Sequence, residues 1–284
     1  QHLRHMGVGV IADNPAIGDN LRDHPGVGVL SYLRREARVA VEDRSLHIGL
    51  RFSSGVAECP PGDMFTSVSC RVGWHGVGRR IGTAMTWVNK PYSVGRISLR
   101  STDYREEPQV ELNYFDDRRD LERLMKGWRF VAGLYDRAPL QRVTRAPIGA
   151  KMSPRVRAAM AVNWKNAVVM GAAGLLLDGP GPLRDMIMKK QISEAPDIED
   201  LKRDDGLLED FVRTTSMGIK HLSCTCRMGD ADDPKAATLT DGRVKGVAGL
   251  RVIDASSMPS LPRCNTNLTT LMIAEKLSDA ILSA

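Results

Sequence analysis

The chain has 284 residues, enough for one large core or two smaller ones, and a formal net charge of +6 at pH 7. Its basic residues are interleaved with acids, as in residues 116–120, which favours a solvated surface, so we expect no nucleic-acid partner. The five cysteines are odd in number and lack the paired spacing of a secreted disulfide framework, so we expect a reducing, cytoplasmic location.

A charge-free apolar run covers residues 167–177. It is shorter than the roughly 20 residues that a membrane-spanning helix needs. The favoured interpretation is a buried helix or a channel-lining segment. The alternative is docking to a membrane that carries a quinone or lipid partner.

Residues 1–28 predict a crossover fragment of an α/β layer. A helix that ends at Gly7 leads into a short strand over residues 8–12, and a turn-rich loop follows. His24 precedes Pro25 in this loop. A histidine that is hydrogen-bonded to the backbone is favoured at that position over a functional one.

Residues 26–101 change to short β-rich runs bounded by Gly and Pro, which predicts an antiparallel sheet in a second domain. Residues 34–50, in contrast, are charged and tolerate a helix. The expected strands cover residues 27–33, 63–70, 81–88 and 95–100.

Residues 105–215 are predicted to be mainly helical. Apolar residues recur at spacings of three and four over 116–137 and on one face over 204–215, the pattern of amphipathic helices. Two further apolar segments lie within 154–190. The Gly-Pro-Gly-Pro run at 179–182 must break the helix between them.

Residues 250–253 form a continuous apolar run, typical of a parallel strand buried on both faces. Asp-Ala-Ser at 254–256 follows its carboxyl end, where open α/β sheets bind ligands. Asn267 or Thr269 can cap a helix that runs to about Ser283, and the unpaired N–H groups of its first turn favour an electron-rich oxygen or nitrogen. An ordinary capped surface helix fits these residues equally well.

His221, Cys224 and Cys226 invite a metal interpretation, with Cys264 as a fourth ligand. Zinc motifs, however, usually separate paired cysteines by two to four residues, and no second tight pair exists, so we expect no metal. Buried cysteines beside a hydrogen-bonded histidine are one alternative. The other is His221 as a catalytic base, because a loop histidine near neutral pKa suits proton abstraction from an alcohol.

These residues resemble the second signature region of the glucose-methanol-choline (GMC) oxidoreductases, a family of FAD-dependent alcohol oxidoreductases, in its choline dehydrogenase-like form. Two earlier stretches, residues 17–24 and residues 95–101 through Asn113-Tyr114, are also similar to the family, so the resemblance touches both ends and the middle of the chain. The C-terminal matches are His221, residues 225–229, residues 249–256, Met258-Pro259, Asn265, Asn267 and Thr270.

The resemblance implies that His221 is the base that accepts the alcohol proton while hydride passes to the flavin N5. Asn265 falls where the family has a His or Asn that binds the substrate oxygen. The implied FAD-binding residues are Asp254 and Ala255 at the ribose and diphosphate, and Asn267, Leu268 and Thr269 with backbone amides at the flavin pyrimidine edge.

The implied fold class is α/β plus α+β: part of an FAD-binding Rossmann-like domain, with a substrate domain of antiparallel sheet and helices. We expect residues 1–28 and 216–284 in the FAD-binding domain. Residues 29–215 then form the substrate-binding domain.

The sequence departs from the family pattern in two places. Leu222 replaces the Pro that usually follows the catalytic histidine, which loosens the expected loop geometry. The family's amino-terminal Gly-x-Gly-x-x-Gly motif is not found, because the Gly-Val-Gly runs at 7–9 and 26–28 lack the third glycine. We therefore expect a carboxyl-terminal half that works as a heteromer with an amino-terminal FAD-binding chain or fragment.

The resulting hypothesis is oxidation of a small-molecule alcohol, with oxygen, a quinone or another carrier as electron acceptor. Two alternatives stay open: a non-catalytic scaffold subunit of a flavoprotein complex, and hydroxynitrile lyase-type chemistry on the same fold. The residues specify neither the alcohol nor the choice between oxidase and dehydrogenase.

Overall fold

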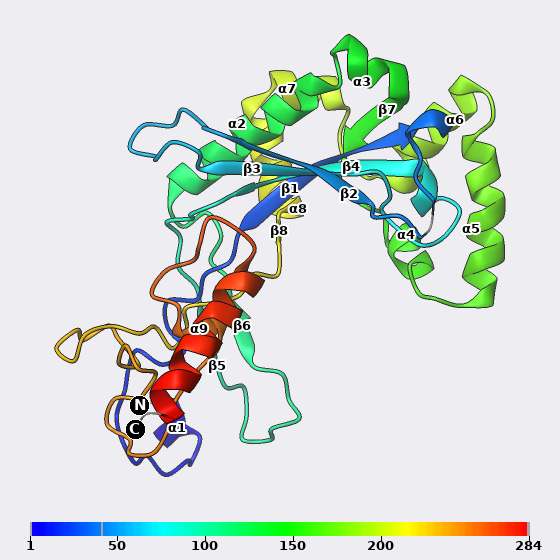
Figure 1. The fold of residues 1–284 in the computed structure, drawn as a ribbon. Helices are drawn as coiled ribbons and strands as arrows, with labels where there is room; N and C mark the ends of the chain where they lie inside the picture. The colour runs from blue at the N-terminus through cyan, green and yellow to red at the C-terminus, as the bar shows by residue number, and fades with distance from the viewer. Residues whose placement is uncertain (1, 41, 283–284) are drawn as a thin grey trace. The chain divides into compact units, whose positions relative to one another are not determined.

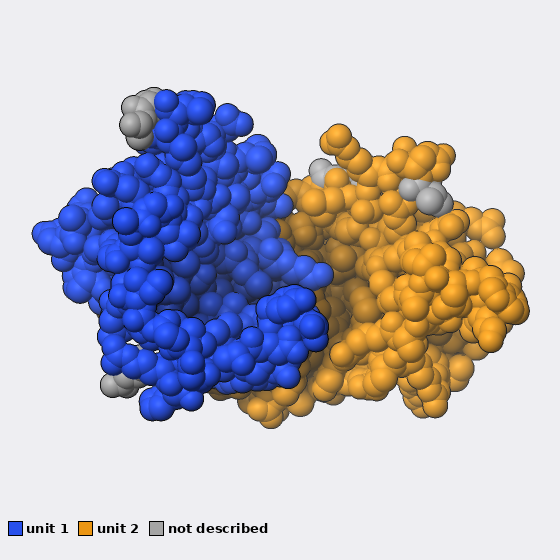
Figure 2. All heavy atoms as spheres, turned by 90° about the horizontal axis from the view of Figure 1, so that it is seen from below, with its two compact units in different colours: residues 1–24, 89–120, 218–284 blue, residues 25–88, 121–217 orange. Residues whose placement is uncertain are grey.

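The structure, a computed structural model, describes residues 2–40 and 42–282 (Figure 1). The chain divides into two compact units, coloured separately in Figure 2. Unit 1 comprises residues 1–24, 89–120 and 218–284, and unit 2 comprises residues 25–88 and 121–217. The predicted domain boundaries place 89–120 in the substrate domain, whereas these residues belong to unit 1. The binding role of each unit stays a prediction.

Unit 2 is built on a sheet in which strands β2, β3, β4, β1 and β7 lie side by side in that order (Figure 1). Neighbouring strands along this path pair antiparallel, which confirms the predicted sheet for residues 27–33, 63–70 and 81–88. The strand expected at 95–100 is not part of it, because β5 (Arg96–Ser98) pairs with β6 (Gln109–Glu111) in a separate two-stranded sheet. All nine residues of β1 are buried, because β4 and β7 flank it on either side. The strands are β1 (Pro25–Leu33), β2 (Leu46–Phe52), β3 (Met64–Ser69), β4 (Ile81–Val88) and β7 (Thr144–Gly149).

Two of these strands lie where the sequence predicted none. β2 begins inside the charged stretch that was expected to tolerate a helix, because Leu46, Ile48 and Leu50 alternate with other residues at the strand period of two. β7 contains Pro147, which an edge strand tolerates, and its register with β1 shifts beside Ala146. The charged residues around β2 and the proline in β7 are why neither strand was predicted.

The helices confirm the amphipathic segments and the predicted break. The indole N–H of Trp128 in α2 donates to the carbonyl oxygen of Gly28 at 3.1 Å, and its ring contacts Phe211 of α8 edge to face. The chain leaves the helical path between α5 and α6, at the Gly-Pro run. The helices are α2 (Arg118–Leu134), α3 (Ala138–Val143), α4 (Pro154–Ala159), α5 (Trp164–Leu177), α6 (Gly181–Ile187), α7 (Ile198–Arg203) and α8 (Asp205–Thr215), with short turns η1 (Arg35–Ala37), η2 (Gly78–Arg80) and η3 (Met188–Ile192).

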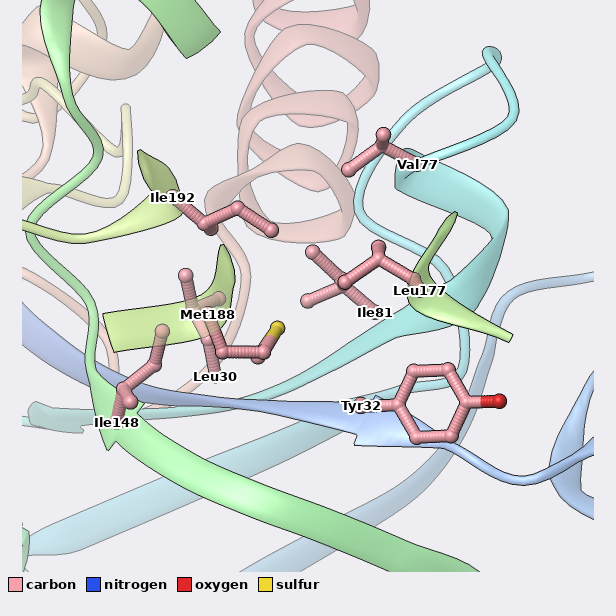
Figure 3. Packing of buried hydrophobic residues seen from close by; sticks show 8 residues of the cluster. All are labelled: Leu30, Tyr32, Val77, Ile81, Ile148, Leu177, Met188 and Ile192. Carbon is pink, nitrogen blue, oxygen red and sulfur yellow. The ribbon is translucent and has the colours of Figure 1, made fainter. Parts of the chain in front are cut away.

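A buried apolar cluster joins the sheet of unit 2 to the helices beside it (Figure 3). Strands β1, β4 and β7 contribute to it, and α5 contributes Leu177. The hydroxyl of Tyr32 points away from the cluster and donates to the carboxylate of Asp178 at 3.0 Å, so the ring is buried without an unpaired polar atom. The members are Leu30, Tyr32, Val77, Ile81, Ile148, Leu177, Met188 and Ile192.

Helix α5 corrects the first of the two interpretations of residues 167–177, a buried helix, and the second, a channel-lining segment, stays a prediction. Only Gly174 and Leu177 of this helix are buried, Met170 is half-buried against the cluster, and most other large apolar side chains, such as Val168 and Leu175, are exposed. Its composition is apolar all round, so the sequence carried no periodicity that distinguishes a buried face. Within the described part of the chain, no helix combines the length and hydropathy that crossing a bilayer requires.

Unit 1 contains little regular structure. Its elements are α1 (His2–His5), the hairpin of β5 (Arg96–Ser98) with β6 (Gln109–Glu111), β8 (Met217–Gly218) at the boundary, the turn η4 (Ala255–Ser257) and α9 (Thr266–Leu282). Helix α9 confirms the predicted terminal helix, although its expected end at Ser283 lies outside the described residues.

Two predicted strands of unit 1 are wrong. Residues 8–12 form no strand, and Ile11 is 93% exposed. The apolar run at 250–253 makes one isolated antiparallel bridge, between Arg251 and Arg243, and Leu250 is 50% exposed. Hydrophobicity alone does not make a strand, because a strand buried on both faces also needs hydrogen-bonded neighbours. The Rossmann-like part of the predicted fold stays a prediction.

The packing in the cluster of Figure 3 lets us predict how substitutions change the free energy of unfolding. We expect Leu177→Ala to lower the free energy of unfolding by about 2 to 5 kcal/mol, because the side chain is 0% exposed and its removal leaves a cavity. Its neighbour Leu176 is 54% exposed, so Leu176→Ala should change the free energy by about 0.5 kcal/mol or less. Urea denaturation of both variants measures the difference, and equal effects would contradict the assigned core.

Candidate functional site

The loop that carries His221 lies along the turn η4. The N–H groups of Cys224, Cys226 and Met228 donate to the carbonyl oxygens of residues 255, 256 and 257, at 3.1, 2.8 and 3.0 Å. Three successive bonds of this kind fix the loop against the segment that the sequence predicted to contact FAD. The structure therefore brings the predicted base and the predicted Asp254–Ala255 site into one unit.

The same loop also packs against apolar side chains. Cys224 is buried in a cluster with Met258 and Leu261, and with Ile273 and Leu277 of α9. Burial raises the pKa of the Cys224 thiol, so it stays protonated near neutral pH, the form that packs rather than binds a metal. No group of three His, Cys, Asp or Glu side chains with the spacing of a metal site occurs among the described residues.

The predicted FAD-binding residues lie in two places, at the turn η4 and at the start of α9. The Asp254 carboxylate accepts hydrogen bonds from the N–H and the hydroxyl of Ser256, at 2.7 and 2.5 Å, and so closes η4. It is nevertheless exposed. Helix α9 begins at Thr266, so Asn267 and Thr269 lie in its first turn and the prediction that one of them caps the helix is wrong. Asn265 precedes the helix instead.

The first turn of α9 is open to solvent. Asn265, Asn267 and Leu268 are exposed, and Thr269 is half-buried. The first N–H groups of an α-helix have no acceptor within the helix, so this end offers hydrogen-bond donors. Among the described residues no hydrogen bond joins Asn265 to His221, although both belong to unit 1.

His221 forms a pair with His24. Their Nδ1 atoms lie 2.8 Å apart, and the ring planes meet at 89°, so the rings contact through nitrogen and are not stacked. On its other side, His24 Nε2 lies 2.8 Å from the carbonyl oxygen of Asn89 and 3.1 Å from that of Pro262. The sequence predicted the backbone contacts of His24 and missed its contact with His221.

A buried carboxylate holds the backbone of both histidines. Asp23 Oδ1 accepts from the N–H of His24 and from the N–H of His221, each at 2.8 Å, and Oδ2 accepts from the Tyr114 hydroxyl at 3.0 Å. Burial and the adjacent Asp23 charge raise the pKa of Tyr114, which keeps its hydroxyl a donor.

Gly218 makes this arrangement possible. A Cβ atom at that position would lie 1.9 Å from Asp23 Oδ2 and 2.5 Å from the Tyr114 hydroxyl oxygen. Any side chain there would displace the carboxylate, so the close approach requires glycine.

Burial favours the neutral form of both histidines. Burial, and then the nearby His221, lower the pKa of His24 to about 4, although the two carbonyl groups at Nε2 oppose the shift. Burial also lowers the pKa of His221 below its ordinary value, and the Asp23 charge opposes this. His221 is 9% exposed. A neutral imidazole can accept a proton.

The histidine pair and the Asp23 contacts lie together on the loops of unit 1. The family model described as GMC oxidoreductase matches residues 91–274, well over half of the chain. The chain therefore belongs to the GMC oxidoreductase family, as the signature residues predicted. The family's relatives are FAD-dependent flavoproteins, which confirms the prediction of FAD as cofactor.

Two curated relatives illustrate the similarity. The 5-(hydroxymethyl)furfural oxidase of Methylovorus sp. (strain MP688) is 37% identical over 285 residues, which cover 99% of this chain and 46% of the relative. The choline oxidase of Arthrobacter globiformis is 27% identical over 292 residues, covering 100% of this chain and 44% of the relative. The chain thus spans about half the length of the curated relatives it matches.

Solved structures agree on the fold. The formate oxidase of Aspergillus oryzae has a TM-score of 0.72 with this chain at 17% identity, and the match covers 99% of this chain and 50% of that one. Pyridoxine 4-oxidase from Mesorbium loti has a TM-score of 0.68 at 18% identity, with coverage of 99% and 47%. At this identity the likeness supports the architecture alone.

The Asp23 carboxylate generates the next prediction. We expect Asp23→Ala to lower the free energy of unfolding by about 3 kcal/mol or more, because it leaves two buried N–H groups and a hydroxyl without an acceptor. Thermal denaturation measures this change. Asp19→Ala is the control, since Asp19 is exposed in the same loop. A loss as small as that of the control would show that Asp23 does not hold the loops.

Proposed function

We propose that this chain carries the substrate-binding part and the acid–base residues of an FAD-dependent alcohol oxidoreductase, with His221 as the base. The observation that carries the proposal is the neutral, nearly buried His221, whose N–H is anchored on Asp23 and whose loop is bonded to η4. Relatives named for oxidation of choline and of a hydroxymethyl compound support a small-molecule alcohol as substrate.

His221 performs the proton transfer with one ring nitrogen. Its Nδ1 atom faces His24, so Nε2 is the atom left to accept the substrate hydroxyl proton. Removal of that proton gives an alkoxide, from which hydride leaves carbon more easily than from the neutral alcohol. When bound, FAD supplies the acceptor for this hydride. Asn265, on the loop before α9, is proposed to bind the substrate oxygen through its amide.

The residues at η4 and at the start of α9 fit an electron-rich cofactor edge. The first turn of α9 is exposed and presents N–H groups without helical acceptors, and the positive end of the helix dipole favours developing negative charge. The small Ala255 permits close approach, and the exposed Asp254 can accept from a ribose hydroxyl. The proposed FAD-binding residues are Asp254, Ala255, Asn267, Leu268 and Thr269.

The remaining FAD contacts are proposed to come from an amino-terminal FAD-binding chain or fragment, equivalent to the part of the relatives that this chain does not match. It can belong to the same polypeptide or to a partner. The electron acceptor is oxygen, a quinone or another carrier, and a cytoplasmic location is proposed from the cysteine content.

The His221 assignment predicts a loss of flavin reduction. In the flavin-loaded protein that contains this chain, we expect His221→Ala to slow reduction by alcohols about 10²- to 10⁴-fold, because no base takes the proton. Stopped-flow absorbance under anaerobic conditions measures the rate. His5→Ala is the control, since His5 is exposed on α1.

Each other result of this experiment has a defined meaning. Unchanged reduction in His221→Ala would remove His221 from the mechanism. A purified wild-type complex without flavin absorbance would favour a non-catalytic scaffold subunit. Cleavage of a cyanohydrin without flavin reduction would favour lyase-type chemistry.

The lowered pKa of His221 also predicts the pH profile. A base must be unprotonated, so kcat/KM should fall as the pH drops through the pKa of His221 and should be level near pH 7. Burial lowers this pKa, so the midpoint is expected below the ordinary value of 6.5. Steady-state rates across the acid range measure the midpoint. A midpoint above that value would contradict the assignment.

A further inference from the structure

The contacts of His24 determine which of its nitrogens carries the proton. Its Nε2 atom faces two carbonyl oxygens, those of Asn89 and Pro262, at 2.8 and 3.1 Å. Carbonyl oxygens only accept hydrogen bonds, so Nε2 must donate. The opposite tautomer would place a lone pair against two oxygens in a buried site, where an unmade hydrogen bond is costly.

Because His24 is neutral, its other nitrogen has no proton. Burial and the adjacent His221 lower the pKa of His24 to about 4, so a doubly protonated ring is not populated near neutral pH. A neutral imidazole has one N–H and one lone pair. With the proton on Nε2, the His24 Nδ1 atom is an acceptor.

The acceptor at His24 Nδ1 determines which nitrogen of His221 carries the proton. The two Nδ1 atoms lie 2.8 Å apart, a hydrogen-bond distance that requires one proton between them. His24 does not supply this proton, so it belongs to His221. The His221 Nδ1 atom is therefore the donor, and its Nε2 atom keeps a lone pair.

We infer that His24 is a positioning residue that holds His221 in the Nδ1-protonated tautomer, with Nε2 free to take a proton from an alcohol. The inference deepens the proposed function and rests on it for the identity of the proton donor. The tautomer itself follows from the contacts of this chain alone.

The device differs from the common pairing of a catalytic histidine with a carboxylate. Here the carboxylate of Asp23 binds the backbone N–H groups of both histidines, and the ring of His221 meets a neutral imidazole instead. A neutral acceptor orients the ring without adding a negative charge in contact with it. His221 thus keeps its orientation while burial lowers its pKa.

The first test reads the tautomer directly. In ¹⁵N-histidine-labelled, flavin-loaded protein, the imidazole ¹⁵N chemical shifts are expected to give a protonated Nδ1 and a bare Nε2 for His221, and the reverse for His24. A protonated Nε2 on His221 at neutral pH would overturn the inference, whatever the activity of the protein.

The second test removes the acceptor. His24→Leu should shift His221 to a mixture of tautomers and lower kcat by about 10-fold or more, with KM little changed, because fewer molecules hold a usable base. His24→Asn places a carbonyl oxygen near the former Nδ1, so it should keep the His221 tautomer and recover most of kcat. An unchanged His221 tautomer and kcat in His24→Leu would overturn the inference.

Controls separate this role from folding and from the proposed function. His75→Leu removes a buried histidine of unit 2 that accepts from the N–H of Gly78, and it should leave the His221 tautomer unchanged. If His24→Leu does not fold, the wild-type spectrum and His24→Asn still decide. If His221→Ala leaves flavin reduction unchanged, the proposed function fails while the tautomer result stands.

Discussion

One buried carboxylate joins the distant segments that make the site. Asp23 Oδ1 accepts from the backbone of His24 and of His221, residues far apart in the chain, and Oδ2 accepts from Tyr114. The bonds to charged oxygen in a buried setting are stronger than neutral ones, so the carboxylate can fix the two segments where they leave the paired strands β1 and β8. Two other features depend on this contact. Residue 218 must be glycine, because no side chain fits beside the carboxylate. The two histidine rings lie together because the backbone N–H groups of both residues donate to the same oxygen.

Local patterns predicted the central strands and the amphipathic helices of unit 2, but they missed β2 and β7, and in unit 1 they predicted two strands that do not form. Short β-rich runs bounded by Gly and Pro predicted β1 and β4, and apolar spacing predicted α2, because the local sequence of each element carries its pattern. β7 escaped prediction because a proline sits in an edge strand, where the missing N–H costs little. At 250–253 the error was the opposite one, because a strand was predicted and does not form. The apolar character of this run is visible in the sequence, but the absence of neighbouring strands is not.

For the candidate site, too, the sequence predicted one part and missed another. The motif around His221 identified the loop, and the bonds from that loop to η4 bring it beside the predicted Asp254–Ala255 segment. The partnership with His24 could not be predicted from spacing, because the two residues are 197 positions apart and the contact depends on irregular loops. The available signals were indirect: a functional role for His24 stood as the less favoured alternative to the backbone-bonded one, and residues 17–24 resembled the family.

The location of these residues within one unit has a chemical consequence. Asp23, His24, Tyr114, Gly218 and His221 all belong to unit 1, so the geometry of the base is complete without any residue of unit 2. Unit 2 contributes a separately packed sheet with its own apolar cluster. Substitutions in the core of unit 2 are therefore expected to change its stability without removing any of the hydrogen bonds that hold the two histidines in unit 1.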